Sequence, residues 1–201
     1  ELDTRLFGIQ PSVGLEPFIR GPLTELLLLC YYSYYLLPLA LGVLLYARGK
    51  RPAYHAYVLA LTLFYALNFI LYAAVPAVGP RFYLNFQAPL QGPWATPYLD
   101  AVMRSAAFTR DCFPSGHTGV TLIMLTFAFL HERRTFWALL PVGTGLVVAT
   151  VACRFHYAVD LLCALPLAYL AVRSARWLSS PRAALARRGA WSIRWRQPAR
   201  A

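Results

Sequence analysis

Long apolar runs separated by short polar stretches occupy most of this 201-residue chain. About 20 consecutive apolar residues are enough to cross the hydrocarbon core of a bilayer as an α-helix. Five runs approach or exceed that length, at 23–46, 54–78, 113–130, 135–153 and 155–172. The pattern predicts an all-α fold, a polytopic membrane helical bundle with about five transmembrane helices.

The polar stretches divide the chain into three parts. Residues 1–22 are interrupted by glycines and prolines and predict an interfacial segment, with a disordered terminus as the alternative. Residues 23–173 form the membrane-embedded domain. Residues 174–201 are rich in Arg and Trp and predict a basic cytoplasmic tail, which either binds an anionic membrane surface or is solvated and disordered. The chain begins without a methionine, so a sixth span upstream is left open.

The composition supports the membrane class. The chain is 59% hydrophobic and only 13% charged, whereas a soluble domain carries about 25% charged residues. A net charge of +11 would suit a nucleic-acid-binding protein, but the Lys and Arg residues cluster beside apolar runs and no nucleic-acid motif is present. We therefore expect a membrane environment and no nucleic-acid partner, with the oligomeric state left open.

The first candidate for chemistry is the stretch Cys112–Thr118, at the start of the third apolar run. Pro114 suits the first turn of a helix, where a missing N–H is tolerated. The backbone N–H groups of Ser115 and Gly116 would then form an anion site at the helix N-terminus. His117 adds a titratable group beside it. The alternative is a helix start that only places a histidine at the membrane interface.

The second candidate is the pair His156 and Asp160, which are four residues apart. On one helix these side chains would share a face. A carboxylate that binds one imidazole nitrogen fixes the tautomer and makes the other nitrogen a better nucleophile or base. The alternative is a buried pair whose polar atoms only bond to each other and take no part in catalysis. That alternative would not explain His117 beside an anion site.

The distribution of positive charge predicts the orientation in the membrane. Thirteen of the nineteen Lys and Arg residues lie in the loops at 48–51 and 133–134 or from Arg173 onward, and the other six lie on the opposite side. The richer side is expected to be cytoplasmic. We therefore expect an integral protein of the plasma or inner membrane with both histidine motifs on the extracytoplasmic face.

The four cysteines are Cys30, Cys112, Cys153 and Cys163, and they lack the spacing of metal ligands. No metal site is therefore expected. Cys112 and Cys153 adjoin the two motifs on the side predicted to be oxidising. We expect free thiols there, with a disulfide between these two as the alternative.

Three motifs, Ser115-Gly116-His117, His156 followed by Asp160, and Gly79-Pro80-Arg81, resemble those of the type 2 phosphatidic acid phosphatase superfamily. This superfamily contains membrane enzymes together with soluble acid phosphatase and vanadium haloperoxidase relatives. The likeness extends from about residue 23 to about residue 170. The tyrosine-rich first span and the Gly-Pro-Arg loop resemble the branch of inositol phosphorylceramide and sphingomyelin synthases.

The resemblance implies phosphoryl transfer from a phosphorylated lipid, without a metal or other cofactor. His156 would attack phosphorus, Asp160 would orient His156, and His117 would act as the acid and base, which agrees with the roles argued from the residues themselves. The phosphate oxygens would be held by the following groups: Arg81, Arg154 and the backbone of Ser115 and Gly116.

Two departures from the superfamily pattern affect the phosphate-binding residues. Many members carry Lys, six residues and then Arg-Pro, but here Leu44 precedes Arg51-Pro52 at that spacing, and Arg81 would replace this motif. Phosphatase-type members also carry Arg six residues before the second histidine, where this chain has Thr150. Arg154 would supply that charge from a different direction.

Three functions therefore remain in competition. Water as the acceptor would make the protein a lipid phosphatase, and an alcohol acceptor would make it a head-group transferase similar to inositol phosphorylceramide or sphingomyelin synthase. A non-catalytic membrane carrier or scaffold is the alternative from another class. The spans contain no charged residues away from their ends, which disfavours a carrier.

Overall fold

A computed structural model describes residues 2–94, 96–98, 101–102 and 110–180, so most of the predicted basic tail lies outside the described residues. The elements in chain order are α1 (Leu2–Phe7), α2 (Pro11–Leu15), α3 (Pro22–Tyr32), the 3-10 helix η1 (Ser33–Tyr35), α4 (Leu37–Ala47), α5 (Arg51–Ala74), α6 (Pro80–Tyr83), α8 (Gly116–His131), α9 (Arg133–Ala152) and α10 (Ala158–Leu178). The described residues contain no strand, only an isolated bridge between Ala77 and Asp111. The all-α prediction is confirmed.

Several helices are long and apolar enough to cross a membrane. α5, α9 and α10 meet this condition individually, and α3–η1 meets it together with α4 as a pair bent by 47°, either a broken span or a re-entrant loop. α8 has only 16 residues, or about 24 Å at 1.5 Å per residue, against a hydrocarbon core of about 30 Å. Each of the five predicted runs therefore contains a helix, and the third is too short to span on its own.

The first span is interrupted where η1 separates α3 from α4. Pro38 is the second residue of α4, and it has no N–H to donate to the preceding turn, so a bend at this position is expected. The first span is therefore kinked at this proline. Its consequence is local, because η1 carries Tyr34 into the interior beside α8.

The N-terminus of α8 differs from the predicted one. Ser115 is the N-cap and its hydroxyl accepts the N–H of Thr118 at 3.3 Å, as a helix-capping serine does. Pro114 precedes this cap, and its peptide bond with Phe113 is cis. The expectation that Pro114 occupies the first helical turn is therefore wrong. The helix begins at Gly116, and Pro114 lies in the loop before the capping residue Ser115.

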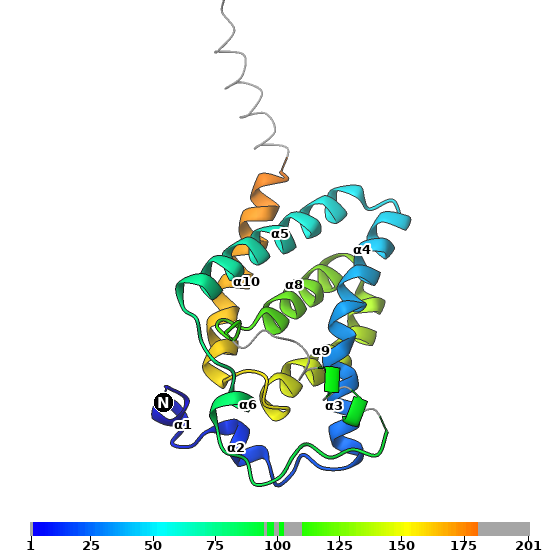
Figure 1. Ribbon diagram of the computed structural model, residues 1–201. Helices are drawn as coiled ribbons and strands as arrows, with labels where there is room; N and C mark the ends of the chain where they lie inside the picture. Colours follow the sequence, from blue (N-terminus) through cyan, green and yellow to red (C-terminus); the bar gives the residue numbers. More distant parts are fainter. Residues whose placement is uncertain (1, 95, 99–100, 103–109, 181–201) are drawn as a thin grey trace, which may run out of the picture.

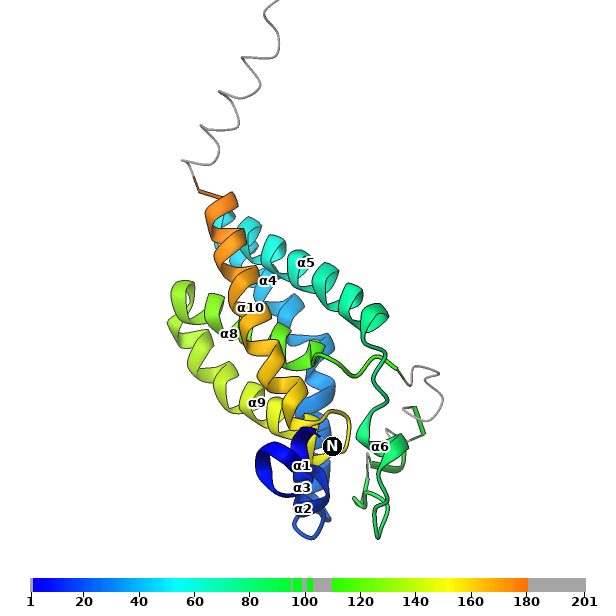
Figure 2. The ribbon, with the colours of Figure 1, turned by 90° about the vertical axis from the view of Figure 1, so that its left-hand side faces the viewer.

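Two apolar clusters hold the bundle together. The larger joins α4, α5, α8 and α10 around fully buried residues such as Phe64, Val120 and Phe127. The smaller joins α3 to the end of α9 and includes Tyr31 and Phe155. Figures 1 and 2 show that α8 lies inside the bundle, with α5, α9 and α10 around it.

The two basic loops meet at one end of the bundle. Glu132 is buried and forms ion pairs with Arg48 and with Lys50, the latter at 3.1 Å. At the opposite end, α1, α2, α3 and α6 lie together (Figure 1). The structure therefore separates the basic loops from the N-terminal helices, in the arrangement that the charge distribution predicted.

Buried carboxylates attach the N-terminal segment to the rest of the fold. Asp3 in α1 is 2% exposed and accepts the N–H groups of Ala158 and Val159 at 2.8 and 2.9 Å, where the first turn of α10 has no intrahelical partners. Glu25 in α3 similarly accepts the backbone N–H groups of Trp94 and Thr96.

We expect the variant Gly119→Ala to be destabilised, because a Cβ there would lie 2.0 Å from the ring of Phe64. Overpacking of this kind costs about 1–3 kcal/mol, more than the gain of about 1 kcal/mol from replacing glycine in a helix. Thermal unfolding in detergent measures the effect. Gly42→Ala is the matched control, because its Cβ would make an ordinary 3.6 Å contact with Tyr57. An equal change in Tm for both variants would contradict the close packing of α8 on α5.

Candidate active site

His156 is held by a backbone carbonyl from a distant part of the chain. It lies in the bend before α10, and its own N–H donates to the carbonyl of Thr150 at 2.8 Å. Its Nδ1 is 2.9 Å from the carbonyl oxygen of Cys112. A carbonyl only accepts, so Nδ1 carries the proton and, in the neutral ring, Nε2 keeps its lone pair.

Asp160 completes the arrangement around this histidine. Its Oδ2 lies 3.5 Å from Nδ1 of His156 and accepts the backbone N–H of Tyr157 at 2.8 Å. The two residues do not share a helix face, since α10 begins only at Ala158. The sequence therefore predicted the pair for the wrong reason: Asp160 caps the helix and meets His156 in the preceding bend.

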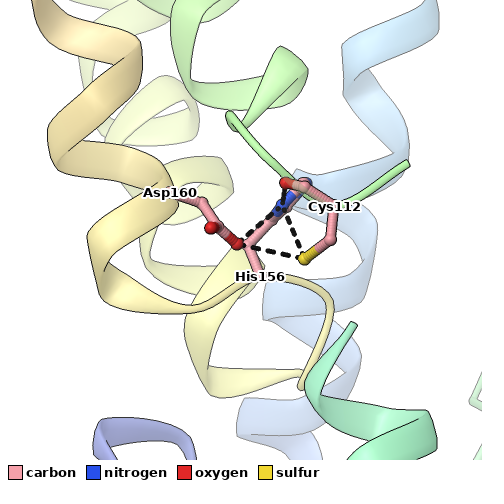
Figure 3. A group of neighbouring side chains, drawn as sticks. All are labelled: Cys112, His156 and Asp160. Carbon is pink, nitrogen blue, oxygen red and sulfur yellow. Dashed lines mark hydrogen bonds and ion pairs between the residues drawn. The ribbon is translucent and has the colours of Figure 1, made fainter. Parts of the chain in front are cut away.

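Cys112 is a third member of this cluster, as Figure 3 shows. Its thiol donates to Oδ2 of Asp160 at 3.0 Å and lies 3.6 Å from Nδ1 of His156. Burial, followed by the negative charge of Asp160, raises the pKa of this thiol, so it remains a proton donor at neutral pH. The cluster contains thiol, imidazole and carboxylate ligand atoms, a potential metal-binding set that the cysteine spacing did not indicate.

All four cysteines are free thiols. The alternative of a bridge between Cys112 and Cys153 therefore does not describe this structure. Cys112 is instead directed toward Asp160.

His117 lies between two aromatic rings of the first predicted span. Its ring stacks on Tyr31 at a centroid distance of 4.3 Å and packs on Tyr34 at 4.2 Å. Tyr31 in turn stacks on Phe155 at 4.0 Å, and the hydroxyl groups of Tyr34 and Tyr65 lie 2.6 Å apart. The sequence did not place these tyrosines at the site. Their spacing of three residues was the available sign that two of them face one site.

The structure brings the two predicted histidines together. The centroids of the His117 and His156 rings are 5.8 Å apart, although the residues are 39 positions apart in sequence. The Nε2 atom of His117 is buried and has no hydrogen-bond partner in the described part of the chain. A buried polar atom without a partner is costly, so Nε2 is suited to binding a group on a ligand.

The predicted anion site at the start of α8 is partly engaged by the protein itself. The N–H of Ser115 donates to the carbonyl of Asp160 at 3.1 Å, and the hydroxyl of Tyr72 lies close to Gly116. A Cβ at Gly116 would lie 3.0 Å from that hydroxyl oxygen and 3.4 Å from Nδ2 of Asn68. Gly116 therefore permits α5 to approach closely, which is a reason for glycine that the sequence did not reveal.

Arg81 and Arg154 line one cavity of about 260 Å³ beside the aromatic stack. The guanidinium of Arg81 lies 5.5 Å from the centroid of the Phe155 ring, next to His156. Its backbone N–H also donates to the carbonyl of Arg154 at 3.1 Å. Arg81 is therefore adjacent to the bend that carries His156.

The guanidinium of Arg154 is engaged by protein groups. It pairs with Glu16 at 3.2 Å, donates to the carbonyl of Ala88 at 2.8 Å, and lies over the ring of Phe86 at 3.9 Å. Arg154 also has a positive φ of 69°, which is uncommon for a residue with a side chain. Its observed contacts fasten the loop after α6 to α2, and phosphate binding by this residue stays a prediction.

Comparison with known proteins gives a match to a protein family. A family model described as the PAP2 superfamily matches residues 2–174. No curated protein and no solved structure matches the chain.

We expect Glu16→Gln to destabilise the protein by about 3 kcal/mol, because it leaves the buried guanidinium of Arg154 without its counter-charge. Both side chains are only 9% exposed. Unfolding in detergent measures the loss, and the same substitution in an Arg154→Met background should cost much less. Equal costs in the two backgrounds would show that the pair is not coupled.

Proposed function

This chain belongs to the PAP2 superfamily, and on that basis we propose that it is a lipid phosphatase or phosphotransferase that works through a phosphohistidine intermediate. Membership supports a phosphatase-type enzyme. The lipid substrate, the intermediate and the role of each residue belong to the proposal.

The observation that carries the proposal is the difference between two neighbouring histidines. His156 has its Nδ1 proton bound by the carbonyl of Cys112, which leaves Nε2 available as a nucleophile. His117 has a buried Nε2 with no partner among the described residues. Phosphoryl transfer through histidine needs two imidazoles with these separate duties, one to attack and one to move a proton.

In the first step, Nε2 of His156 attacks phosphorus and forms the N–P bond while the bond from phosphorus to the lipid oxygen breaks. Protonated His117 gives its Nε2 proton to that oxygen, which leaves as an alcohol. The carboxylate of Asp160, 3.5 Å from Nδ1, stabilises the positive charge that develops on the His156 ring.

In the second step, an acceptor hydroxyl attacks the phosphohistidine. Neutral His117 takes the proton of this hydroxyl, the new O–P bond forms, and the N–P bond breaks to restore His156. Water as the acceptor releases inorganic phosphate. An alcohol as the acceptor yields a new phospholipid, the outcome suggested by the resemblance to head-group transferases.

The phosphate oxygens need positive charge and hydrogen-bond donors throughout. We assign this role first to Arg81, beside the bend at His156, and to the hydroxyl of Ser115 and the N–H of Gly116. Ser115 can donate its hydroxyl proton while it accepts the N–H of Thr118. Arg154 would join only by exchanging its contacts with Glu16.

The proposed reaction requires no metal ion. The nucleophile is an imidazole nitrogen, the acid and base is a second imidazole, and the charge is stabilised by cationic side chains and backbone groups. Each function that a metal would supply in phosphoryl transfer is therefore assigned to a group of the chain.

An apolar cavity beside Asp160 supports a lipid substrate. It has a volume of about 500 Å³ and is lined mainly by apolar side chains, including Leu2, Val75, Val78 and Val159. An acyl chain in this cavity would gain about 0.8 kcal/mol for each buried methylene group. Its position next to Asp160 would keep the chain close to a phosphate bound at His156.

We further propose that the site faces the extracytoplasmic side. The support is the grouping of the basic loops around Glu132 at one end of the bundle, together with the excess of Lys and Arg at that end. The lipid would then reach the site from the outer leaflet.

We expect His156→Ala to lower turnover by about 10³-fold or more, because the nucleophile is lost. The assay follows phosphate release, and new phospholipid when an alcohol is supplied, from lipid phosphates and phosphodiesters in detergent. His55→Ala removes an exposed histidine of α5 and should retain full activity. Turnover that persists in a folded His156→Ala protein would refute the phosphohistidine mechanism.

A second variant tests the lipid. Val78→Trp should fill the apolar cavity and lower kcat/KM for a long-chain lipid phosphate roughly 50-fold, equivalent to about three displaced methylene groups. Hydrolysis of p-nitrophenyl phosphate, which has no acyl chain, should be unchanged. Val58→Trp, at an exposed position of α5, is the control. Equal losses on both substrates would contradict an acyl chain in this cavity.

A further inference from the structure

The short N-terminal helix α1 is attached to the catalytic part of the fold through a buried carboxylate. Asp3 is 2% exposed, whereas all the other residues of α1, each of them described, are exposed. Its two carboxylate oxygens accept the N–H groups of Ala158 and Val159 at 2.8 and 2.9 Å. Figures 1 and 2 show α1 beside the beginning of α10. The position of α1 therefore bears directly on the turn that follows the bend of His156.

This first turn of α10 also carries the proposed catalytic carboxylate. Asp160 accepts the N–H of Tyr157 at 2.8 Å, so the N–H groups of three successive residues are bound by the carboxylates of Asp160 and Asp3. A helix leaves these groups without intrahelical partners, and its dipole favours negative charge beside them. The two N–H groups bound by Asp3 lie between His156 and Asp160 in the sequence. Asp3 is therefore placed to hold the geometry of this catalytic pair.

The neighbouring residue of α1 faces the proposed lipid site. Leu2 and Asp3 both line the apolar cavity of about 500 Å³ that reaches Asp160. The side chains of Leu2, Leu6 and Phe7 are 58%, 59% and 48% exposed. Exposed apolar side chains on a short helix at the end of membrane spans are suited to the acyl boundary of a bilayer. α1 is therefore both a wall of the cavity and a surface suited to lipid.

We propose that α1 couples the acyl chain of the substrate to the catalytic bend. A chain that fills the cavity packs against Leu2, and Asp3 transmits this contact to the first turn of α10. The inference rests on the proposed function, in which a lipid phosphate reacts at His156 while its chain occupies this cavity. Asp3 is a positioning residue in this scheme, because it acts through the backbone of α10 and does not touch the phosphate.

The coupling has a direct physical cause. Leu2 gains packing contacts when an acyl chain lies against it, and the hydrogen bonds of Asp3 then hold α1 and the first turn of α10 in one geometry. Binding energy from a distant part of the substrate is thereby used to position the reacting groups. A substrate with a short chain consequently loses kcat as well as affinity, whereas uniform binding of the chain would change KM alone.

The dependence of kcat on chain length tests the coupling. kcat is measured in detergent for a long-chain and a short-chain lipid phosphate, and the ratio of the two values is compared between proteins. We expect a ratio of about 10 or more in the unmodified protein, and of about one in Asp3→Ala, which removes both hydrogen bonds, and in Leu2→Asn, which removes the apolar wall. Arg5→Ala, at an exposed position of the same helix, should keep the ratio of the unmodified protein.

The two variants should also be non-additive, because they interrupt one path. A double variant should show the same ratio as Leu2→Asn or Asp3→Ala alone. A purely structural role of Asp3 would lower kcat equally for both chain lengths and leave the ratio unchanged. Asp3→Asn keeps an oxygen that accepts an N–H and should give an intermediate ratio. Leu2→Asn changes an exposed residue, so it keeps the test valid if Asp3→Ala does not fold.

Hydrogen exchange makes the test independent of turnover. A long-chain alkylphosphonate at saturating concentration should slow amide exchange in the peptide that contains Ala158 and Val159 at least about fivefold more than a short-chain one. Asp3→Ala should abolish this difference. A ratio of about one in the unmodified protein, an unchanged ratio in Asp3→Ala, or protection that does not depend on chain length would overturn the inference. Chain-dependent protection in a protein that turns over no phosphate ester would refute the proposed function while supporting the coupling.

Discussion

The site depends on the contacts that join the segment before α8 to the beginning of α10. The carbonyl of Cys112 binds Nδ1 of His156, and the N–H of Ser115 binds the carbonyl of Asp160. The first contact joins a backbone carbonyl to the His156 ring, and the second joins two backbone groups, so both fix the spacing of the two segments. These contacts bring together the histidine at the start of α8 and the histidine before α10, and the carboxylate of Asp160 adds negative charge beside them.

The N-terminal segment holds the same region from the other side. Asp3 caps the first turn of α10, and Glu16 pairs with Arg154 two residues before His156. Removing these carboxylates would expose unpaired N–H groups and a buried guanidinium, both of which are costly. These contacts cross the boundary predicted at residue 22, so the bend that carries His156 is positioned by residues about 140 to 155 places earlier in the chain. The match of the superfamily model from residue 2 onward agrees with this dependence.

Apolar periodicity predicted the helices well, because a membrane span is determined by a local run of side chains. The bend at Pro38 is equally local, since proline acts on its own turn. The chemistry of His156 and Asp160 was recognised from spacing, but their actual contact arises in a bend rather than on a helix face. Tyr31 and Tyr34 around His117, Glu16 beside Arg154 and Cys112 beside Asp160 were missed for a common reason. Each is a contact between distant segments, and no local pattern encodes which segments meet.

The short α8 explains why such contacts are needed. A helix of about 24 Å is shorter than a hydrocarbon core of about 30 Å. His117, at the start of this helix, lies within the bundle between the rings of Tyr31 and Tyr34. A phosphate that reaches this depth loses much of its hydration, which is costly unless charged groups replace the water. The break in the first span brings Tyr34 to His117, and the guanidinium of Arg81 lies 5.5 Å from the Phe155 ring beside His156. Irregular backbone inside a membrane bundle is tolerated where it lines a site. The kinked span, the short helix and the loop with Arg81 therefore together place polar side chains inside an apolar bundle.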